Sequence, residues 1–361
     1  MNFKIYQSFI IKKYLINIIS LSGVFLILSF IMNILEEIKF FSNYEVEFYL
    51  PIVLTLLNIP GVIYQIFPFI ILLSIFSLVS NFIENNELQT FKTNGLSNFS
   101  MVKIITITSF FVGLFIVVVF YNLSAKFKTS YLSIKKNFTE DDQYLAAITE
   151  NGLWIKDEID NETIIFVNAQ SINSNELIDV DITFLDNDFK YLKSLSSKKI
   201  DIRSTNWIIN NPLIINDENI NTNDKQMILK TNFNYTKINN LYSDLSALTI
   251  WGLFKLRDDY LDVGYSTTEI DYQLHKIFSH PINIMIISIL SLVLIMNFKI
   301  INNKFHVIVL GVFISVIIYY INHFFGVIGK SEKIPLVQSV WIPLLVLFLF
   351  SIIGMVKINE K

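Results

Sequence analysis

Six stretches without any Asp, Glu, Lys or Arg occur along the chain, and each is long enough to cross a lipid bilayer. They are Tyr14–Leu35, Phe48–Ile83, Ile104–Ala125, Ile277–Phe298, Phe305–Gly329 and Ile334–Val356. A membrane-spanning helix needs roughly 20 mostly apolar residues, and every window meets that length. The pattern predicts three spanning helices, a polar stretch at about 123–275, and three more spanning helices.

The second window is longer than one simple span requires, and it contains Pro51, Pro60 and Pro68. Proline removes a backbone donor and breaks or kinks a helix. We therefore expect a short segment at the membrane surface before Pro60, followed by a span over about 62–83.

The polar stretch has the pattern of β-strands. Short runs rich in β-branched residues are separated by clusters of Asn, Asp and Ser, and several runs alternate apolar with polar positions. The runs are Thr163–Val167, Leu177–Phe184, Lys199–Arg203 and Gln226–Lys230. Such a series predicts an antiparallel sandwich or jelly roll. The apolar spacing of Leu245, Leu248, Leu253 and Leu256 then predicts a return to helix over 241–275.

Together these patterns predict a membrane α-helical protein with six transmembrane helices in a 3+3 arrangement and an inserted extracytoplasmic all-β, jelly-roll-like domain. We expect an N-terminal membrane half at 1–125, the β domain with a C-terminal helical connector at 126–275, and a C-terminal membrane half at 276–361. The hydrophobic content of 53% and the mean hydropathy of +0.51 are far above the values of soluble proteins.

Lys and Arg in the short flanking segments predict the orientation, because they favour the cytoplasmic side. With both termini inside, nine Lys lie in cytoplasmic segments: Lys4, Lys12, Lys13, Lys92, Lys103, Lys299, Lys304, Lys357 and Lys361. The outside flanks hold four: Lys39, Lys276, Lys330 and Lys333. The pattern therefore favours cytoplasmic N- and C-termini and an extracytoplasmic β domain.

Residue patterns typical of enzymes, metal sites and cofactor sites are missing from the sequence. The chain has no Cys, no H-E-x-x-H and no G-x-S-x-G, and its four His show no metal-ligand spacing. We expect no catalytic residue, metal or cofactor. His280 lies just inside the fourth window; a titratable group there is a functional candidate, but a helix-capping or interfacial role is favoured.

One polar loop between the second and third spans, residues 84–97, has a pattern of its own. Glu84 and Glu87 lie near the start of a short helical pattern, where the helix dipole favours acids, and Leu88 and Phe91 are spaced to share one face. Gly95 is placed to end the helix. The loop is either a solvated turn or an amphipathic cytoplasmic helix suited to docking on another protein.

The segment Asn86-Glu87-Leu88-Gln89-Thr90-Phe91-Lys92-Thr93-Asn94-Gly95-Leu96-Ser97 resembles the coupling helix of the LptF/LptG lipopolysaccharide-export permeases. Five other segments resemble motifs of that family in the expected order: Leu35–Lys39, Asn151–Lys156, Trp207–Ile209, Glu269–Pro281 and Pro335–Pro343. The Trp341-Ile342-Pro343 ending resembles the G-type subunit more than the F-type.

The resemblance implies one half of a heterodimeric permease in an ABC exporter, paired with a paralogous six-helix subunit and powered by a cytoplasmic ATPase dimer. Lipopolysaccharide would pass from the inner membrane to jelly-roll bridge proteins in the periplasm. The ATPase-coupling residues would be Glu84, Glu87, Leu88, Phe91, Lys92 and Gly95, with Glu87 paired to a basic residue of the ATPase and Leu88 and Phe91 in its apolar pocket. Lipid-contact candidates are Lys39, Glu36 and Glu37.

The sequence departs from the family pattern at several of these positions. Phe91-Lys92 stands where the family has Leu-Arg, and Lys39 alone represents the basic residues usual at the outer end of the first helix. For Lys39, a role as an interfacial anchor is as well supported as a lipid contact. For Glu36 and Glu37, a solvated helix end is favoured.

Two other classes of function are consistent with parts of the pattern. A membrane sensor with an extracytoplasmic β domain that binds a ligand fits the layout, but the cytoplasmic segments are too short for an output domain. A membrane-embedded enzyme would need paired catalytic groups in the spans, where the windows offer only His280, His323 and hydroxyl groups.

Overall fold

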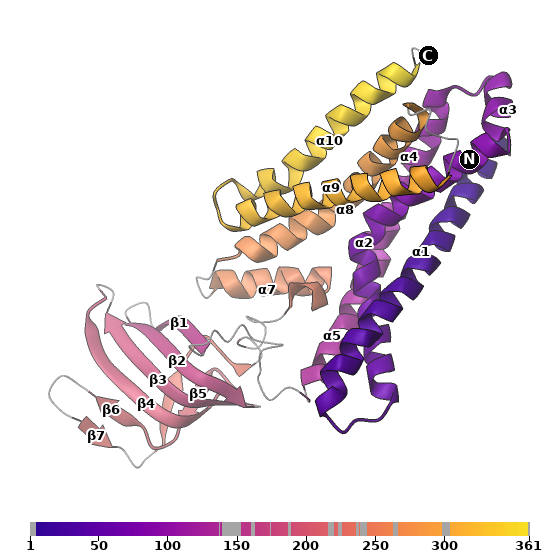
Figure 1. Ribbon diagram of the computed structural model, residues 1–361. Helices are drawn as coiled ribbons and strands as arrows, with labels where there is room; N and C mark the ends of the chain where they lie inside the picture. Colours follow the sequence, from indigo (N-terminus) through magenta and orange to yellow (C-terminus); the bar gives the residue numbers. More distant parts are fainter. Residues whose placement is uncertain are drawn as a thin grey trace. The chain divides into compact units, whose positions relative to one another are not determined.

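The computed structural model describes residues 5–136, 138, 153–159, 163–173, 175–186, 189–215, 220–222, 226–235, 238, 244–262, 266–297 and 304–359. These residues form two compact units (Figure 1). One contains residues 1–131 and 268–361, and the other contains residues 132–267. The first is a helical membrane unit, and the second contains the β-sheet.

The membrane unit is formed mainly by long helices. In chain order they are α1 (Ile5–Phe40), α2 (Tyr49–Glu84), α3 (Glu87–Thr93), α4 (Asn98–Phe115), α5 (Asn122–Lys136), α8 (Thr268–Asn297), α9 (Lys304–Lys330) and α10 (Leu336–Asn359). Among the described residues, six helices are long and apolar enough to cross a membrane. The predicted 3+3 arrangement is therefore confirmed.

Helices α2 and α8 form the interior of the membrane unit. In their most apolar windows 67% and 72% of residues are buried, against 11% for both α1 and α9. Helix α2 packs against α1, α8 and α9, while α8 also packs against α4 and α10. The outward faces of α1 and α9 are apolar and exposed, as expected of helices that meet lipid or a second subunit.

Helix α2 is continuous through both internal prolines, Pro60 and Pro68. The predicted separate segment before Pro60 is therefore wrong. The prolines remove backbone hydrogen bonds, but packing on neighbouring helices holds the flanking turns: Leu54, Ile59 and Ile63 are all buried.

The third span continues without a break beyond its apolar window. Helix α4 passes through a π-helical segment, Ile116–Tyr121, directly into α5. The wider π turn places an additional residue in the helix, which changes the direction of the side chains that follow. Lys128 and Tyr131 of α5 belong to the membrane unit.

The second unit contains one antiparallel sheet of eight strands. These are β1 (Leu153–Ile159), β2 (Thr163–Asn173), β3 (Glu176–Asp186), β4 (Tyr191–Asp201), β5 (Asn206–Ile209), β6 (Leu213–Ile215), β7 (Ile220–Thr222) and β8 (Met227–Lys230). The order is β1-β2-β3-β4-β5-β8, and β6 pairs with both β4 and β7. The predicted inserted all-β domain is confirmed, with its longest strands arranged as a meander (Figure 1).

The core of the sheet lies on the face that carries the alternating apolar residues. Val180, Ile182 and Phe184 of β3 are buried on this face. Trp207 of β5 is fully buried, and its indole nitrogen donates to the Phe233 carbonyl oxygen at 2.8 Å. A buried indole N–H needs such a partner, so this bond fixes the segment after β8 over the core.

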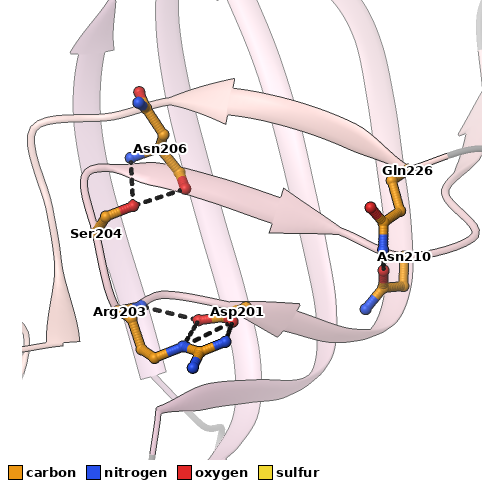
Figure 2. A network of polar contacts seen from close by, with 6 residues as sticks. All are labelled: Asp201, Arg203, Ser204, Asn206, Asn210 and Gln226. Atoms are coloured by element: carbon orange, nitrogen blue, oxygen red, sulfur yellow. Dashed lines mark hydrogen bonds and ion pairs between the residues drawn. The ribbon is translucent and has the colours of Figure 1, made fainter.

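A polar turn joins β4 to β5 (Figure 2). The Arg203 side chain and backbone donate to the Asp201 carboxylate, and the Asn206 backbone N–H donates to the Ser204 hydroxyl. The Arg203 guanidinium holds the pKa of Asp201 below its ordinary value. The strand predicted at Lys199–Arg203 is therefore misplaced, since β4 ends at Asp201 and Arg203 belongs to the turn. Beyond the turn, Gln226 donates to Asn210.

Farther along the second unit, the predicted helical pattern forms the helix α7 (Ile250–Asp262), preceded by a single 3-10 turn at Leu245–Ala247. Leu253 and Leu256 lie on its buried face. The segment Asn151-Gly152 that carried part of the family resemblance lies outside the described residues.

Candidate functional site

The loop between α2 and α4 contains the short helix α3. Asn86 precedes it in the left-handed conformation, with φ of 58°, and Glu87 occupies its first turn. At its end Gly95 has φ of 83°. The Leu96 N–H donates to the Phe91 carbonyl at 2.9 Å and the Gly95 N–H to the Lys92 carbonyl at 3.0 Å. This pair of bonds is a Schellman motif, and it confirms Gly95 as the residue that ends the helix.

Phe91 of α3 is half-buried and packs against two other helices of the membrane unit. Its ring centroid lies 6.1 Å from that of Phe9 on α1 and 5.6 Å from that of Phe82 on α2. Phe9 and Phe82 also stack on one another at 6.4 Å. Three helices thus meet in one aromatic cluster. The sequence did not predict this internal contact for Phe91.

Glu87 forms an ion pair with a residue of α1. Its Oε1 lies 3.6 Å from Lys13 Nζ. The other oxygen, Oε2, is buried and has no hydrogen-bond partner among the described residues. The Lys13 Nζ also lies 5.3 Å from the Phe9 ring centroid. The charge of Glu87 is therefore balanced by Lys13 in this subunit.

The remaining predicted coupling residues differ in exposure. Leu88 is half-buried, whereas Glu84 and Lys92 are exposed. The outward surface of α3 is polar and includes Gln89 and Thr90. The polar outward face of α3 is therefore the surface that is open to a partner.

The other end of α1 carries the predicted lipid-contact residues, and the structure separates them. Glu36 and Lys39 are exposed. Glu37 is only 3% exposed, and the Tyr131 hydroxyl of α5 donates to its Oε1 at 2.8 Å. The interpretation of Glu37 as a solvated helix end is therefore wrong, because this carboxyl group joins α1 to α5.

A chain of polar side chains, absent from the sequence prediction, lies beside this end of α1. Lys128 Nζ of α5 donates to Asn58 Oδ1 of α2 at 2.9 Å, and Asn58 Nδ2 donates to Asn33 Oδ1 of α1 at 2.7 Å. Asn33 donates in turn to the Ser29 carbonyl at 2.8 Å. Two Asn within charge-free windows were a usable signal, since buried amides need partners. Lys128 was missed because composition assigned it to the polar domain.

His280 lies within α8, twelve residues after the helix begins at Thr268, and is 7% exposed. Its ring stacks on Tyr64 of α2 at 4.7 Å, and Tyr64 lies 5.0 Å from Tyr121 in the π-helical segment. His280 therefore does not cap the helix. His280 packs α8 against the central helix α2.

No group of three or more His, Asp or Glu side chains is arranged to hold a metal ion within the part of the chain that the structure describes. The polar contacts described above in the membrane unit link helices to one another.

The family model of the lipopolysaccharide export system permease LptF/LptG matches residues 8–357. This match covers nearly the whole chain, including both membrane halves and the β domain. The chain belongs to the LptF/LptG family. No curated protein sequence matches it.

Membership of the LptF/LptG family gives this protein the role of a lipopolysaccharide-export permease, a transport subunit of the inner membrane with several spans. The match also gives a context to α3, whose sequence resembles the coupling helix of LptF/LptG proteins.

Proposed function

We propose that this protein is the transmembrane subunit of an ABC exporter that extracts lipopolysaccharide from the inner membrane, driven by a separate cytoplasmic ATPase dimer. It pairs with a paralogous six-helix subunit and passes the lipid to jelly-roll bridge proteins in the periplasm. The observation that carries this proposal is the family match over residues 8–357, supported by a capped helix at the position of the coupling segment.

Helix α3 is the surface that receives the ATPase. A helix that transmits a push must be held in a fixed orientation, and α3 is fixed by the Gly95 cap and by Phe91. Glu84 and Lys92 are exposed and can meet charged groups of the ATPase, and half-buried Leu88 offers it an apolar contact. Since a carboxylate has about four lone-pair sites, Glu87 can accept from a basic residue of the ATPase while paired to Lys13.

The proposed orientation has both termini and α3 in the cytoplasm and the β domain in the periplasm. Helix α1 has 36 residues, which corresponds to about 54 Å of helix, whereas the hydrocarbon core is about 30 Å thick. Residues beside α3 and residues near Lys39 therefore lie on opposite sides of the membrane. The distribution of Lys in the short flanks supports the same orientation.

Lipid contacts are proposed for the exposed residues at the outer end of α1. Lys39 offers a cation to a lipid phosphate, and Glu36 offers an acceptor to sugar hydroxyl groups. Glu37 acts there by fixing α1 to Tyr131. Acyl chains meet the exposed apolar faces of α1 and α9. The Trp341-Ile342-Pro343 segment favours the G type.

The β domain offers two strands for an edge-to-edge handover. β1 and β8 end the main strand order, and an edge strand presents backbone donors and acceptors to a further strand. We propose that a periplasmic bridge protein continues the sheet at one of these edges.

Co-purification tests the proposed function. The tagged protein is extracted in mild detergent and its partners are identified. A stoichiometric P-loop ATPase and a second six-span subunit are expected, and Glu87→Lys should lose the ATPase. Glu47→Lys changes an exposed acid beyond the opposite end of α1 and should retain it. A protein that purifies alone would contradict the proposal.

A further inference from the structure

Helix α3 and the beginning of α1 meet through matching pairs of side chains. Phe9 and Lys13 are four residues apart on α1, and Glu87 and Phe91 are four residues apart on α3. Residues at this spacing lie on one helix face. The aromatic member of each pair meets its counterpart at 6.1 Å, and the charged member meets its counterpart at 3.6 Å. We call these four residues, together with Phe82, the α1–α3 clamp.

The two parts of the clamp differ in strength. The Lys13 and Glu87 side chains are 45% and 26% exposed, and a pair so accessible to water contributes little stability by itself. The phenylalanine rings supply most of the attraction, since aromatic pairs gain beyond the area they bury. The ion pair adds a constraint on the position of α3 along α1, because Lys13 Nζ and Glu87 Oε1 lie 3.6 Å apart.

The clamp joins α3 to a helix that is not its neighbour in the sequence. Short connections link α3 covalently to α2 and α4, so a push on α3 reaches those helices in any case. Contact with α1 adds a third route. Helix α1 contains no proline, whereas α2 contains two in its interior, Pro60 and Pro68. Only 11% of the apolar window of α1 is buried, and its main packing partner is α2.

The far end of α1 carries the proposed lipid contacts. Lys13 and Lys39 are 26 residues apart, which corresponds to about 39 Å along a helix. A continuous helix of this kind moves as one body, so a displacement at Lys13 is reproduced at Lys39 and at the bond between Glu37 and Tyr131.

We propose that Phe9 and Lys13 are positioning residues for energy coupling: they clamp the coupling helix to α1, so that α1 carries the movement of the ATPase to the lipid-contact end of the same helix. This inference rests on the proposed function. It adds a specific route for the movement, which begins at two residues of α1, a helix that does not adjoin α3 in the sequence.

A functional experiment uses the complete complex with its ATPase, reconstituted in nanodiscs. ATP hydrolysis is measured with and without lipopolysaccharide in the wild type, in the double variant Phe9→Ala/Lys13→Ala, and in Lys12→Ala. The double variant should still bind the ATPase. The stimulation of ATP hydrolysis by lipopolysaccharide should fall about threefold to tenfold. Lys12→Ala removes a neighbouring exposed charge and should behave as wild type. Wild-type stimulation in the double variant would overturn the inference.

A distance experiment tests the clamp without relying on activity. Because the chain has no Cys, spin labels can be placed at Lys12→Cys and Thr90→Cys, two exposed positions beside the clamp. A single narrow distance is expected, unchanged by a non-hydrolysable ATP analogue and broadened by Phe9→Ala/Lys13→Ala. A distance that shifts with nucleotide would mean that α3 slides over α1, and the inference would be wrong.

The two proposals fail in different ways. If the wild-type protein binds no ATPase, the proposed function is wrong whatever the spin labels report. If the ATPase binds and the double variant keeps full lipid stimulation, the exporter function holds and the α1 route is wrong.

Discussion

Tyr131 holds the buried carboxyl group of Glu37 at the junction of α1 and α5. Tyr131→Phe removes only the donor hydroxyl while the ring stays in place. Weakening the bond to a buried acceptor costs about 1–3 kcal/mol, so we expect a lower melting temperature in detergent. Tyr49→Phe removes an exposed hydroxyl and should leave the melting temperature unchanged. Equal stability of both variants would mean that this bond is not formed in solution.

The His280 ring is held by stacking, and its Nε2 has no hydrogen-bond partner among the described residues. His280→Phe keeps an aromatic ring against Tyr64 and removes buried polar atoms, so we expect stability within about 1 kcal/mol of wild type. His280→Ala leaves a cavity and should cost about 2–4 kcal/mol. Thermal unfolding measures both. If His280→Phe folds normally but abolishes lipid transport, the imidazole has a chemical role in addition to packing.

Residue identity was a poor guide to burial at the outer end of α1. Glu36 and Glu37 are adjacent and identical, yet one is exposed and the other is 3% exposed. They differ because Glu37 lies on the face of α1 that packs against α5, and which face does so depends on tertiary packing. The sequence indicated the polar end of the helix but could not indicate which carboxyl group turns inward.

At the scale of elements, a comparison of two glycines distinguishes the effect of backbone conformation from the effect of packing. Both Gly61 and Gly95 have open space around an added Cβ, but only Gly95 has a positive φ. Gly95→Ala should cost about 1–2 kcal/mol, since the left-handed conformation is unfavourable for a residue with Cβ. Gly61→Ala lies inside α2 and should be neutral or stabilising by up to about 1 kcal/mol.

The measurement for these variants is ATPase recovery in a pull-down, with thermal unfolding in parallel. Gly95→Ala should recover less ATPase because the end of α3 is disordered, and Gly61→Ala should recover the wild-type amount. Gly95→Asn should lie between them, because Asn tolerates the left-handed conformation better than Ala. Full recovery with Gly95→Ala would show that the cap is dispensable for docking.

Elements with a strong apolar pattern were predictable, and short polar ones were not. All six spans follow directly from composition, whereas β4 was placed too late in the chain because Tyr191–Ser197 alternates weakly. The expected break before Pro60 failed for another reason: proline weakens a helix locally, but burial on several sides of α2 outweighs that cost. Local propensity therefore yields to tertiary packing in α2.

On the scale of the whole molecule, the two units differ in how well their internal structure follows from sequence. In the membrane unit, the requirement that backbone groups be satisfied inside lipid leaves helices as the form that a spanning segment of this kind adopts. In the β unit, the strand order departs from a simple meander, because β4 pairs with both β5 and β6 and β5 pairs with β8. The strand order therefore could not be predicted from the sequence pattern and came from the structure.

The orientation of the whole chain can be tested by labelling, because the chain has no native Cys. Thr90→Cys on α3 and Trp154→Cys on β1 are both exposed positions, one in each unit. In cells with a permeabilised outer membrane and an intact inner membrane, an impermeant maleimide should label position 154 and leave position 90 unlabelled. Disruption of the inner membrane should then expose position 90. The reverse pattern would place α3 on the side without ATP, where no ATPase could drive it, and the exporter mechanism would be excluded together with the orientation.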